Sequence, residues 1–192
     1  MRLLFSLLFT FTTAALLGLG ATWLAATEAF APGEIAMGAW SAAPTKGSAT
    51  IEPFARAAIA RSGVLPLAHG DGIALIARHD DAGRPLDGRC DVVIAGSMPP
   101  ARYWTLTLHD PDGALVANAV GRHGFTSREI LWGAAGGMEI VAAERARPGN
   151  WLPTGGAARY VLALRLYDTP LNLATRSGRA TPMPSVTAGS CP

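Results

Sequence analysis

The chain of 192 residues is long enough for one domain with a hydrophobic core and barely long enough for two. Its 49% hydrophobic and 16% charged residues exclude an intrinsically disordered protein, because disorder requires low hydrophobicity and high net charge. The net charge is only +2 and the arginines are scattered along the chain, which argues against binding of nucleic acid.

An uncharged apolar run near the N-terminus predicts a membrane-spanning helix. It extends over residues 3–27, and a helix needs roughly 20 residues to cross a bilayer. Arg2 lies on one side of the run, whereas Glu28 and Glu34 lie on the other. The positive-inside rule then keeps the N-terminus in the cytoplasm. We therefore expect a single-pass inner-membrane protein whose bulk is periplasmic.

A cleaved signal peptide is the alternative for the same run. Residues 29–31 fit a small-x-small cleavage site, but Pro32 directly after them disfavours cleavage. The apolar region of a signal peptide is also shorter, at about 7–15 residues. Both interpretations send residues 28–192 across the membrane.

Two cysteines, Cys90 and Cys191, occur in the chain, and no C-x-x-C motif is present. This excludes the zinc and thioredoxin-like motifs that require such spacing. In an exported chain, an even pair of cysteines predicts a disulfide. The bond would tie the Pro-, Ser- and Thr-rich tail at 176–192 to the rest of the domain, whereas the alternative is two unrelated thiols.

Beyond the apolar run, the sequence divides into a linker and one domain. Residues 28–50 contain Pro, Gly, Ser and Thr with little periodicity and are typical of a linker. Residues 51–192 form the expected domain, after an anchor at 1–27. Within this domain, residues 52–61 have the pattern of a short helix with a proline in its first turn.

Past this helix the hydrophobic period changes to two, which predicts strands. The expected strands are 72–78, 90–96, 102–110, 115–120, 129–133, 137–143 and 159–168. In the third of these, Trp104, Leu106 and Leu108 should face the core, and 115–120 should return beside it as a hairpin. No helices separate the strands, which argues against a parallel α/β fold. We expect a mainly β domain, an antiparallel sandwich or jelly roll with one or two short helices.

Several motifs, in this order, resemble an exported bacterial family known as "domain of unknown function 1214". They are GAW (38–40), EPFARA (52–57), D-x-x-G-x-x-L-x-G ending at Gly88, RYWTLTLHDPDG (102–113), NWLP (150–153), LRLYDTP (164–170) and MPSVTAGSC ending at Cys191. In this family the domain is often the C-terminal half of a longer protein, behind a second uncharacterised domain, number 1254. The resemblance therefore implies a fold and, as a partner, a separately encoded protein carrying that N-terminal half.

This chain also departs from the family pattern. The family tends to carry an acidic residue and an aromatic residue where residues 72–74 stand. It tends to have Trp and Tyr where Tyr103 and His109 stand. A reaction that depended on that acid would be lost in this member.

Arginine and aromatic residues in one place would suit a planar or anionic ligand, through cation–π contacts and paired hydrogen bonds. The candidate ligand-binding residues are Arg102, Trp104, Asn150, Trp151, Arg165 and Tyr167. The alternative is structural, because Trp104 alternates correctly for the core and a neighbouring arginine can bond backbone carbonyls.

The sequence carries no recognisable catalytic or metal-binding motif. His79 and His109 stand beside aspartates, but in turn segments where Asp is favoured for turn chemistry alone. No G-x-S-x-G occurs, and Glu139 is the only plausible inward-facing acid on an expected strand. We expect no metal, no cofactor and no catalytic residues.

The expected function is that of a binding or accessory module for a partner protein or envelope ligand. The alternative is an envelope enzyme acting on a small polar or carbohydrate-like substrate near Arg102, Asn150 and Arg165.

Overall fold

The computed structural model describes residues 2–26, 33–62, 65–133, 136–171, 181–189 and 191. The chain divides into two compact units. The first comprises residues 1–32 and 49–65, and the second comprises residues 33–48 and 66–192.

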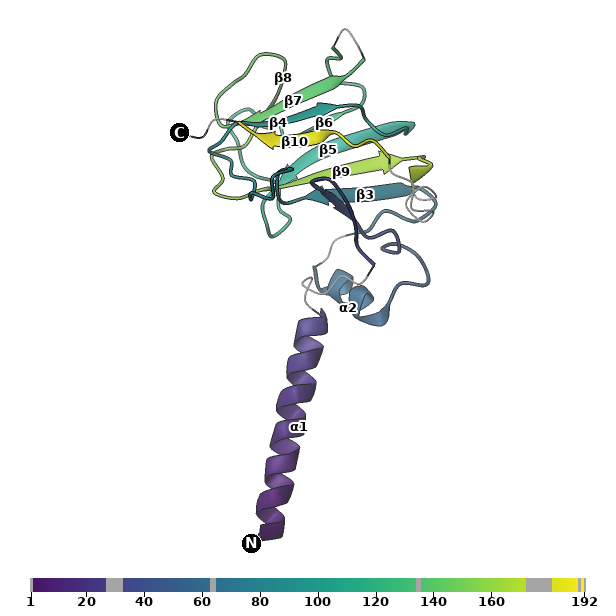
Figure 1. Ribbon diagram of the computed structural model, residues 1–192, viewed down its shortest axis with the longest axis vertical. Coiled ribbons are helices and arrows are strands. Elements are labelled where there is room, and N and C mark those ends of the chain that lie inside the picture. Colours follow the sequence, from purple (N-terminus) through teal and green to yellow (C-terminus); the bar gives the residue numbers. More distant parts are fainter. Residues whose placement is uncertain are drawn as a thin grey trace. The chain divides into compact units, whose positions relative to one another are not determined.

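The first unit contains two helices, α1 (Arg2–Ala26) and α2 (Pro53–Ser62) (Figure 1). Within residues 2–24 of α1, a stretch of 18 residues has a mean hydropathy of 1.9, and none of that stretch is buried. Among the described residues, it is the only helix long and apolar enough to cross a membrane. A signal sequence near the N-terminus can meet the same criterion of length and hydropathy, so the helix agrees with both interpretations.

The short helix expected at 52–61 is confirmed as α2. Pro53 occupies its first position, where a missing N–H costs nothing. The Glu52 carboxylate accepts a hydrogen bond of 3.0 Å from the backbone N–H of Ala55 and so caps the helix start. At the other end, the Arg61 guanidinium lies 5.3 Å from the ring centroid of Trp23 in α1.

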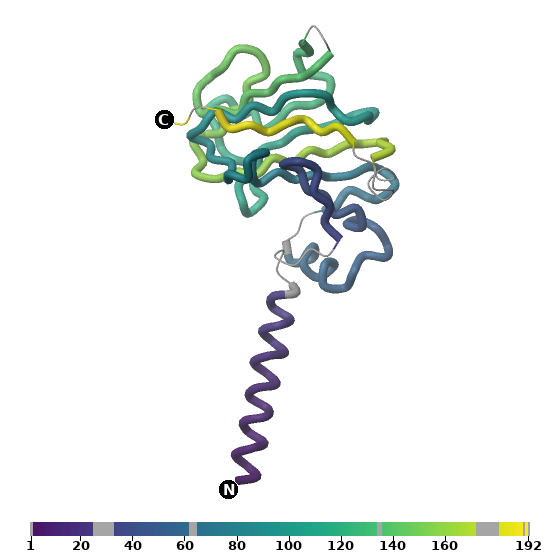
Figure 2. Tube along the Cα trace, viewed as in Figure 1, coloured from purple at the N-terminus to yellow at the C-terminus, as the bar shows by residue number. Residues whose placement is uncertain are grey.

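The second unit consists of two β-sheets, which confirms the mainly β expectation (Figures 1 and 2). The six-stranded sheet has the order β1 (Ile35–Met37), β2 (Trp40–Ala42), β3 (Gly72–Ala77), β9 (Val161–Tyr167), β5 (Tyr103–His109) and β6 (Gly124–Thr126). The four-stranded sheet has the order β10 (Ser185–Ala188), β4 (Val92–Gly96), β7 (Met138–Ala143) and β8 (Asn150–Pro153). All neighbours are antiparallel except β7 and β8, which are parallel.

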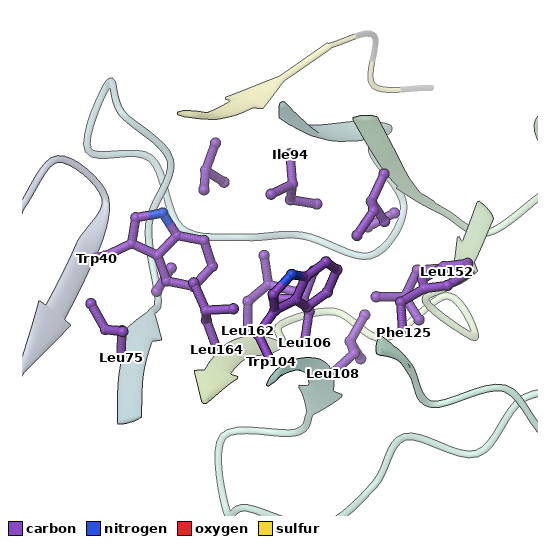
Figure 3. Close-up of a cluster of buried hydrophobic side chains, with 14 of the residues drawn as sticks. Trp40, Leu75, Ile94, Trp104, Leu106, Leu108, Phe125, Leu152, Leu162 and Leu164 are labelled. Atoms are coloured by element: carbon purple, nitrogen blue, oxygen red, sulfur yellow. The ribbon is translucent and has the colours of Figure 1, made fainter. Parts of the chain in front are cut away.

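The hydrophobic core lies between these two sheets (Figure 3). Trp104, Leu106 and Leu108 point inward from β5, as their alternation predicted. Leu162, Leu164 and Leu166 do the same from β9, and Ile94, Ile140 and Leu152 cover them from the four-stranded sheet. Each such side chain contributes about 1.5–3 kcal/mol when it is fully removed from water. The sandwich therefore depends on the inner faces of β5 and β9.

The predictions of two strands, at 115–120 and 129–133, are wrong. Residues 115–120 form a loop with one isolated bridge, from His109 to Leu115, and the strand beside β5 is β6. The Asn118 side chain explains this difference, because it bonds the backbone of Val120 and of Arg122 and closes the loop on itself.

The segment 129–133 is likewise no strand and makes a single bridge, from Trp132 to Met138. The N–H and the C=O of Leu131 bond the side-chain amide of Asn150, each at 2.8 Å. Because a side chain takes both backbone groups, no ladder forms at this residue.

Part of the segment expected to be a linker is strand. Residues 35–42 form the β1–β2 hairpin, in which Met37 pairs with Trp40 across a two-residue turn. Gly38 has a φ of +62° in this turn, a conformation that favours glycine. Trp40 is buried and donates its indole N–H to the carbonyl of Pro184, at 2.7 Å. These strands are too short to show a period in the sequence.

Cys90 and Cys191, the expected disulfide pair, lie at disulfide distance in the structure, with their Cα atoms 4.2 Å apart. The bond closes a separation of 101 residues. Nearby, β10 pairs with β4, and the N–H of Gly189 continues the pairing to the carbonyl of Asp91, at 2.7 Å. The C-terminal strand is thus held by a ladder and by a covalent bond.

Reduction of the disulfide should lower the free energy of unfolding by about 2–5 kcal/mol, because the unfolded chain regains the entropy of a long open loop. Thermal unfolding of the full chain in detergent, with and without a reductant, measures the effect. The double variant Cys90→Ser/Cys191→Ser should unfold at the lower temperature and should not respond to the reductant. An unchanged midpoint of the native chain in reductant would contradict the prediction.

Candidate functional site

Three of the six candidate residues lie in the core or in the four-stranded sheet. Trp104 is 3% exposed and packs edge-on against Trp132, with 6.4 Å between ring centroids. Asn150 is buried on β8, where its side chain bonds the backbone of Leu131 and donates to the carbonyl of Glu139 at 2.8 Å. Its neighbour Trp151 donates its indole N–H to a backbone carbonyl of β7.

The other three come from the β5–β9 pair: Arg165 and Tyr167 lie on β9, and Arg102 directly precedes β5. The backbone N–H of Arg102 donates to the carbonyl of Tyr167, at 3.1 Å. The Arg102 guanidinium is 3.7 Å from the Asp168 carboxylate, but both side chains are largely exposed, so this ion pair contributes little. Because Asn150 lies on the other sheet, it does not line one groove with Arg102 and Arg165.

The outward face of β5 and β9 carries a continuous row of aromatic, hydroxyl and cationic side chains, here named the Arg165 face. Its members, all half-buried, are Tyr103, Thr105, Thr107, His109, Arg165 and Tyr167. Tyr103 and Tyr167 are directly paired across the strands, with 5.8 Å between ring centroids. Strict alternation on both strands turns these residues outward while the leucines turn inward.

Arg165 stands in the middle of this face. Its direct neighbours across the ladders are Ala74 on β3 and Thr105 on β5, both shorter side chains. Its guanidinium Nη1 donates to the hydroxyl of Thr107, at 3.2 Å. Arg165 makes no ion pair with any carboxylate of the described residues, so its charge has no counterpart within that part of the protein.

His109 continues the hydrogen-bonded row. Its Nε2 lies 2.8 Å from the Thr107 hydroxyl, and its Nδ1 lies 3.1 Å from the carbonyl of Gly113. Because a carbonyl only accepts, Nδ1 carries the hydrogen and Nε2 accepts from Thr107. Burial, together with the charge of Arg165, lowers the pKa of His109, against opposing effects of Gly113 and Asp110. The imidazole is therefore neutral at pH 7.

The residues of the D-x-x-G-x-x-L-x-G motif have structural roles. Asp80 is buried and accepts hydrogen bonds from the N–H groups of Ala82 and Arg84 and from the Arg84 guanidinium. Burial alone would raise the pKa of Asp80, but the hydrogen bonds and charge of Arg84 outweigh it and lower the pKa. At Gly88, an added Cβ would come within 2.6 Å of the carbonyl of Ala157.

The following residue, Asp81, joins the two sheets. One carboxylate oxygen accepts from the N–H of Ala39 at 3.1 Å, beside β2, and the other from the N–H of Val186 at 2.8 Å, in β10. The aspartates beside His109 are also used in a turn, since the Asp110 carboxylate accepts from the N–H groups of Asp112 and Ala114. Within the described residues, no three His, Cys, Asp or Glu side chains converge as metal ligands.

The sequence did not single out Thr107 and His109 as partners of Arg165. The available signal was alternation, which places both on the outward face of 102–110. The pairing of that segment with 159–168 was not apparent from the sequence. Two motifs of the family resemblance, 102–113 and 164–170, supply all the residues of the Arg165 face.

The sequence that forms most of this domain has a counterpart among known families. The chain belongs to the family described as "Protein of unknown function (DUF1214)", whose model matches residues 71–171. The resemblance noted in the sequence is thereby confirmed. No curated protein matches the chain.

Two solved structures are similar to this protein. The crystal structure of a protein from Vibrio parahaemolyticus is 22% identical, with a TM-score of 0.57, and the match covers 73% of this chain and 36% of that chain. An uncharacterised protein from Burkholderia cenocepacia is 19% identical, with a TM-score of 0.42, over 64% of this chain and 30% of that chain. The Vibrio likeness shows the fold alone, and this chain spans about a third of that protein.

Replacing Asp80 by Ala should lower the free energy of unfolding at pH 7 by about 2–4 kcal/mol, because buried N–H groups and Arg84 lose their acceptor. Urea unfolding measures this loss. Since the folded-state pKa is lowered, the carboxylate stabilises the fold above the ordinary Asp range and stops doing so as the pH falls through its folded pKa.

The difference between native chain and variant should therefore shrink in acid. Asp112→Ala serves as the control, because its exposed side chain should contribute less than about 0.5 kcal/mol. A difference that grows on acidification would contradict the assignment.

Proposed function

We propose that this protein is a membrane-tethered binding module of the bacterial envelope whose ligand is a small carboxylate-bearing molecule held on the Arg165 face. The apolar helix α1 supports the tether, with the rest of the chain in the periplasm. The Cys90–Cys191 disulfide supports the oxidising compartment, since such bonds persist outside the cytosol.

The observation that carries the ligand class is the cation of Arg165 without a described carboxylate partner. Half-burial weakens the hydration of Arg165. Its one side-chain hydrogen bond to the described residues, to Thr107, leaves further N–H donors of the guanidinium for a ligand. A guanidinium matches a carboxylate with two parallel hydrogen bonds. The geometry therefore favours an anion with two oxygens on one carbon.

The paired tyrosines favour a ligand that also has a flat or ring-shaped part. The pair Tyr103–Tyr167 lies two ladder positions from the pair Thr105–Arg165, and therefore on the same face. Aromatic rings with a polar hydroxyl bury apolar ligand surface while remaining compatible with water. A ring attached to a carboxylate could reach both groups at once.

Benzoate is a suitable first probe, and the experiment is a calorimetric titration of the full chain in detergent at pH 6. Arg165→Gln should weaken binding at least about tenfold, because the paired charged hydrogen bonds are lost. Arg165→Lys should recover only part of the affinity, since an ammonium cannot form the planar pair. Arg145→Gln, an exposed arginine between β7 and β8, is the matched control and should bind normally. Equal binding by Arg165→Gln and the native chain would exclude this site.

The location is tested with alkaline phosphatase fused after Pro192, which is active only where its disulfides form. We expect an active fusion in the membrane fraction. Intact mass of the purified protein then separates an anchor, which retains residues 3–27, from a cleaved signal peptide. A fusion active only in the cytosol would contradict the proposed compartment.

The expected protein partner is also a proposal: a separately encoded chain carrying the additional domain of the family. The limited overlap with the Vibrio structure supports it, because that fold continues well beyond the part matched here. Co-purification from membranes in mild detergent, followed by mass spectrometry, is the test. Recovery of the protein without any chain of that family would count against it.

A further inference from the structure

One hydroxyl, that of Thr107, connects the cation and the imidazole of the Arg165 face. It receives a hydrogen bond from Arg165 at 3.2 Å and lies 2.8 Å from Nε2 of His109. A third group, the carbonyl of Ala163, lies 3.4 Å from the same oxygen. These atoms come from β5 and β9, with Thr107 and Arg165 58 residues apart in the chain.

The Thr107 hydroxyl can donate only one hydrogen bond. This restricts the protonation states that the side chains of the Arg165 face can adopt together. With neutral His109, the proton goes to Nε2, and the oxygen accepts from Arg165. When Nε2 takes up a proton it becomes a donor, so the Thr107 proton must turn to the Ala163 carbonyl or outward to a ligand. Two cations then donate to a single oxygen, which is unfavourable unless a negative charge lies beside them.

We propose that the Arg165 face takes up one proton with its carboxylate ligand, and that His109 is the group that receives it, through Thr107. This inference rests on the proposed function and adds a regulation of the same site. The ligand supplies the negative charge that makes a second cation acceptable. The face therefore binds a carboxylate more tightly as the surroundings become acidic.

The charged groups around His109 are consistent with this linkage. Arg165 on β9 and His123, next to β6, both disfavour a positive imidazole, whereas Asp110 in the adjoining turn favours it. The Gly113 carbonyl holds Nδ1 in either state and fixes the ring. A bound anion would oppose the charge of Arg165 and so shift the balance toward protonated His109.

The lowered pKa of His109 gives the sign of the effect. Without ligand, burial and Arg165 keep the imidazole neutral until the pH falls below its ordinary range. A carboxylate on Arg165 raises the pKa of His109, and by reciprocity the protonated protein binds the carboxylate more tightly. One linked proton changes the affinity at most tenfold for each pH unit.

The experiment is the benzoate titration of the full chain in detergent, repeated at pH 5.5 and pH 7.5, where benzoate itself stays ionised. We expect about tenfold tighter binding at the lower pH. Calorimetry in buffers of different ionisation enthalpy should show uptake of a proton. The histidine ring resonances in NMR should show the pKa of His109 rising when benzoate is added.

Two variants assign the proton. His109→Gln keeps a polar group beside Thr107 but cannot be charged, and Thr107→Val keeps the shape but removes the connecting oxygen. For each variant the readout is the ratio of its own benzoate affinities at pH 5.5 and pH 7.5, and this ratio should fall close to one in both. His79→Gln, an exposed histidine after β3, should keep the full pH dependence.

The outcomes separate the two proposals. Binding that needs Arg165 but has the same affinity at both pH values would overturn the proton linkage and leave the ligand site standing. Benzoate binding that still depends on pH in His109→Gln would also overturn the proton linkage. Binding that is absent, or that survives Arg165→Gln, would remove the site and the linkage together. Acetate and phosphate, titrated in parallel, distinguish a carboxylate receptor from a site for any anion.

Discussion

The pairing of β5 with β9 is the constraint on which the rest of the structure depends. Its register joins Tyr103 to Tyr167 and continues to His109 and Val161. Because side chains alternate along a strand, this one ladder places leucines and Trp104 on the core side and a polar row on the other side. A slip of one residue in either strand would turn polar side chains into the core and leucines into water. The same hydrophobic burial that stabilises the sandwich therefore positions the Arg165 face.

Smaller contacts complete the sandwich at its margins. Asp81 bonds backbone groups beside β2 and in β10, and Trp40 donates across to Pro184, so the two sheets are linked by polar as well as apolar contacts. The disulfide holds the chain end close to β4. On the outward face of β5 and β9, the half-buried Arg165 forms no ion pair with a carboxylate of the described residues, which is consistent with a role in recognition.

Sequence reasoning predicted the inner faces of the long strands well, because a period of two in Trp104, Leu106 and Leu108 reports burial directly. It was less successful in the loops. At 115–120 and 129–133 the residues suit strands, but the amides of Asn118 and Asn150 take the backbone groups that a ladder would need. Of the six candidate ligand residues, two, Arg165 and Tyr167, belong to the Arg165 face, since residue type indicates a chemistry but not which elements meet.

The sequence by itself determined the apolar leading segment, the cysteine pair, the family and the face on which each residue of a long strand lies. These properties are local or compositional, so they can be read without knowing which segments are neighbours. The tertiary structure alone decided that residues 102–110 lie beside 159–168, that the short hairpin at 35–42 joins the sheet, and that β8 runs parallel to β7. Long-range pairing is selected by the collective burial of many side chains, and no local pattern specifies the partner strand. The connection of Arg165 to His109 through Thr107 exists only because of that pairing.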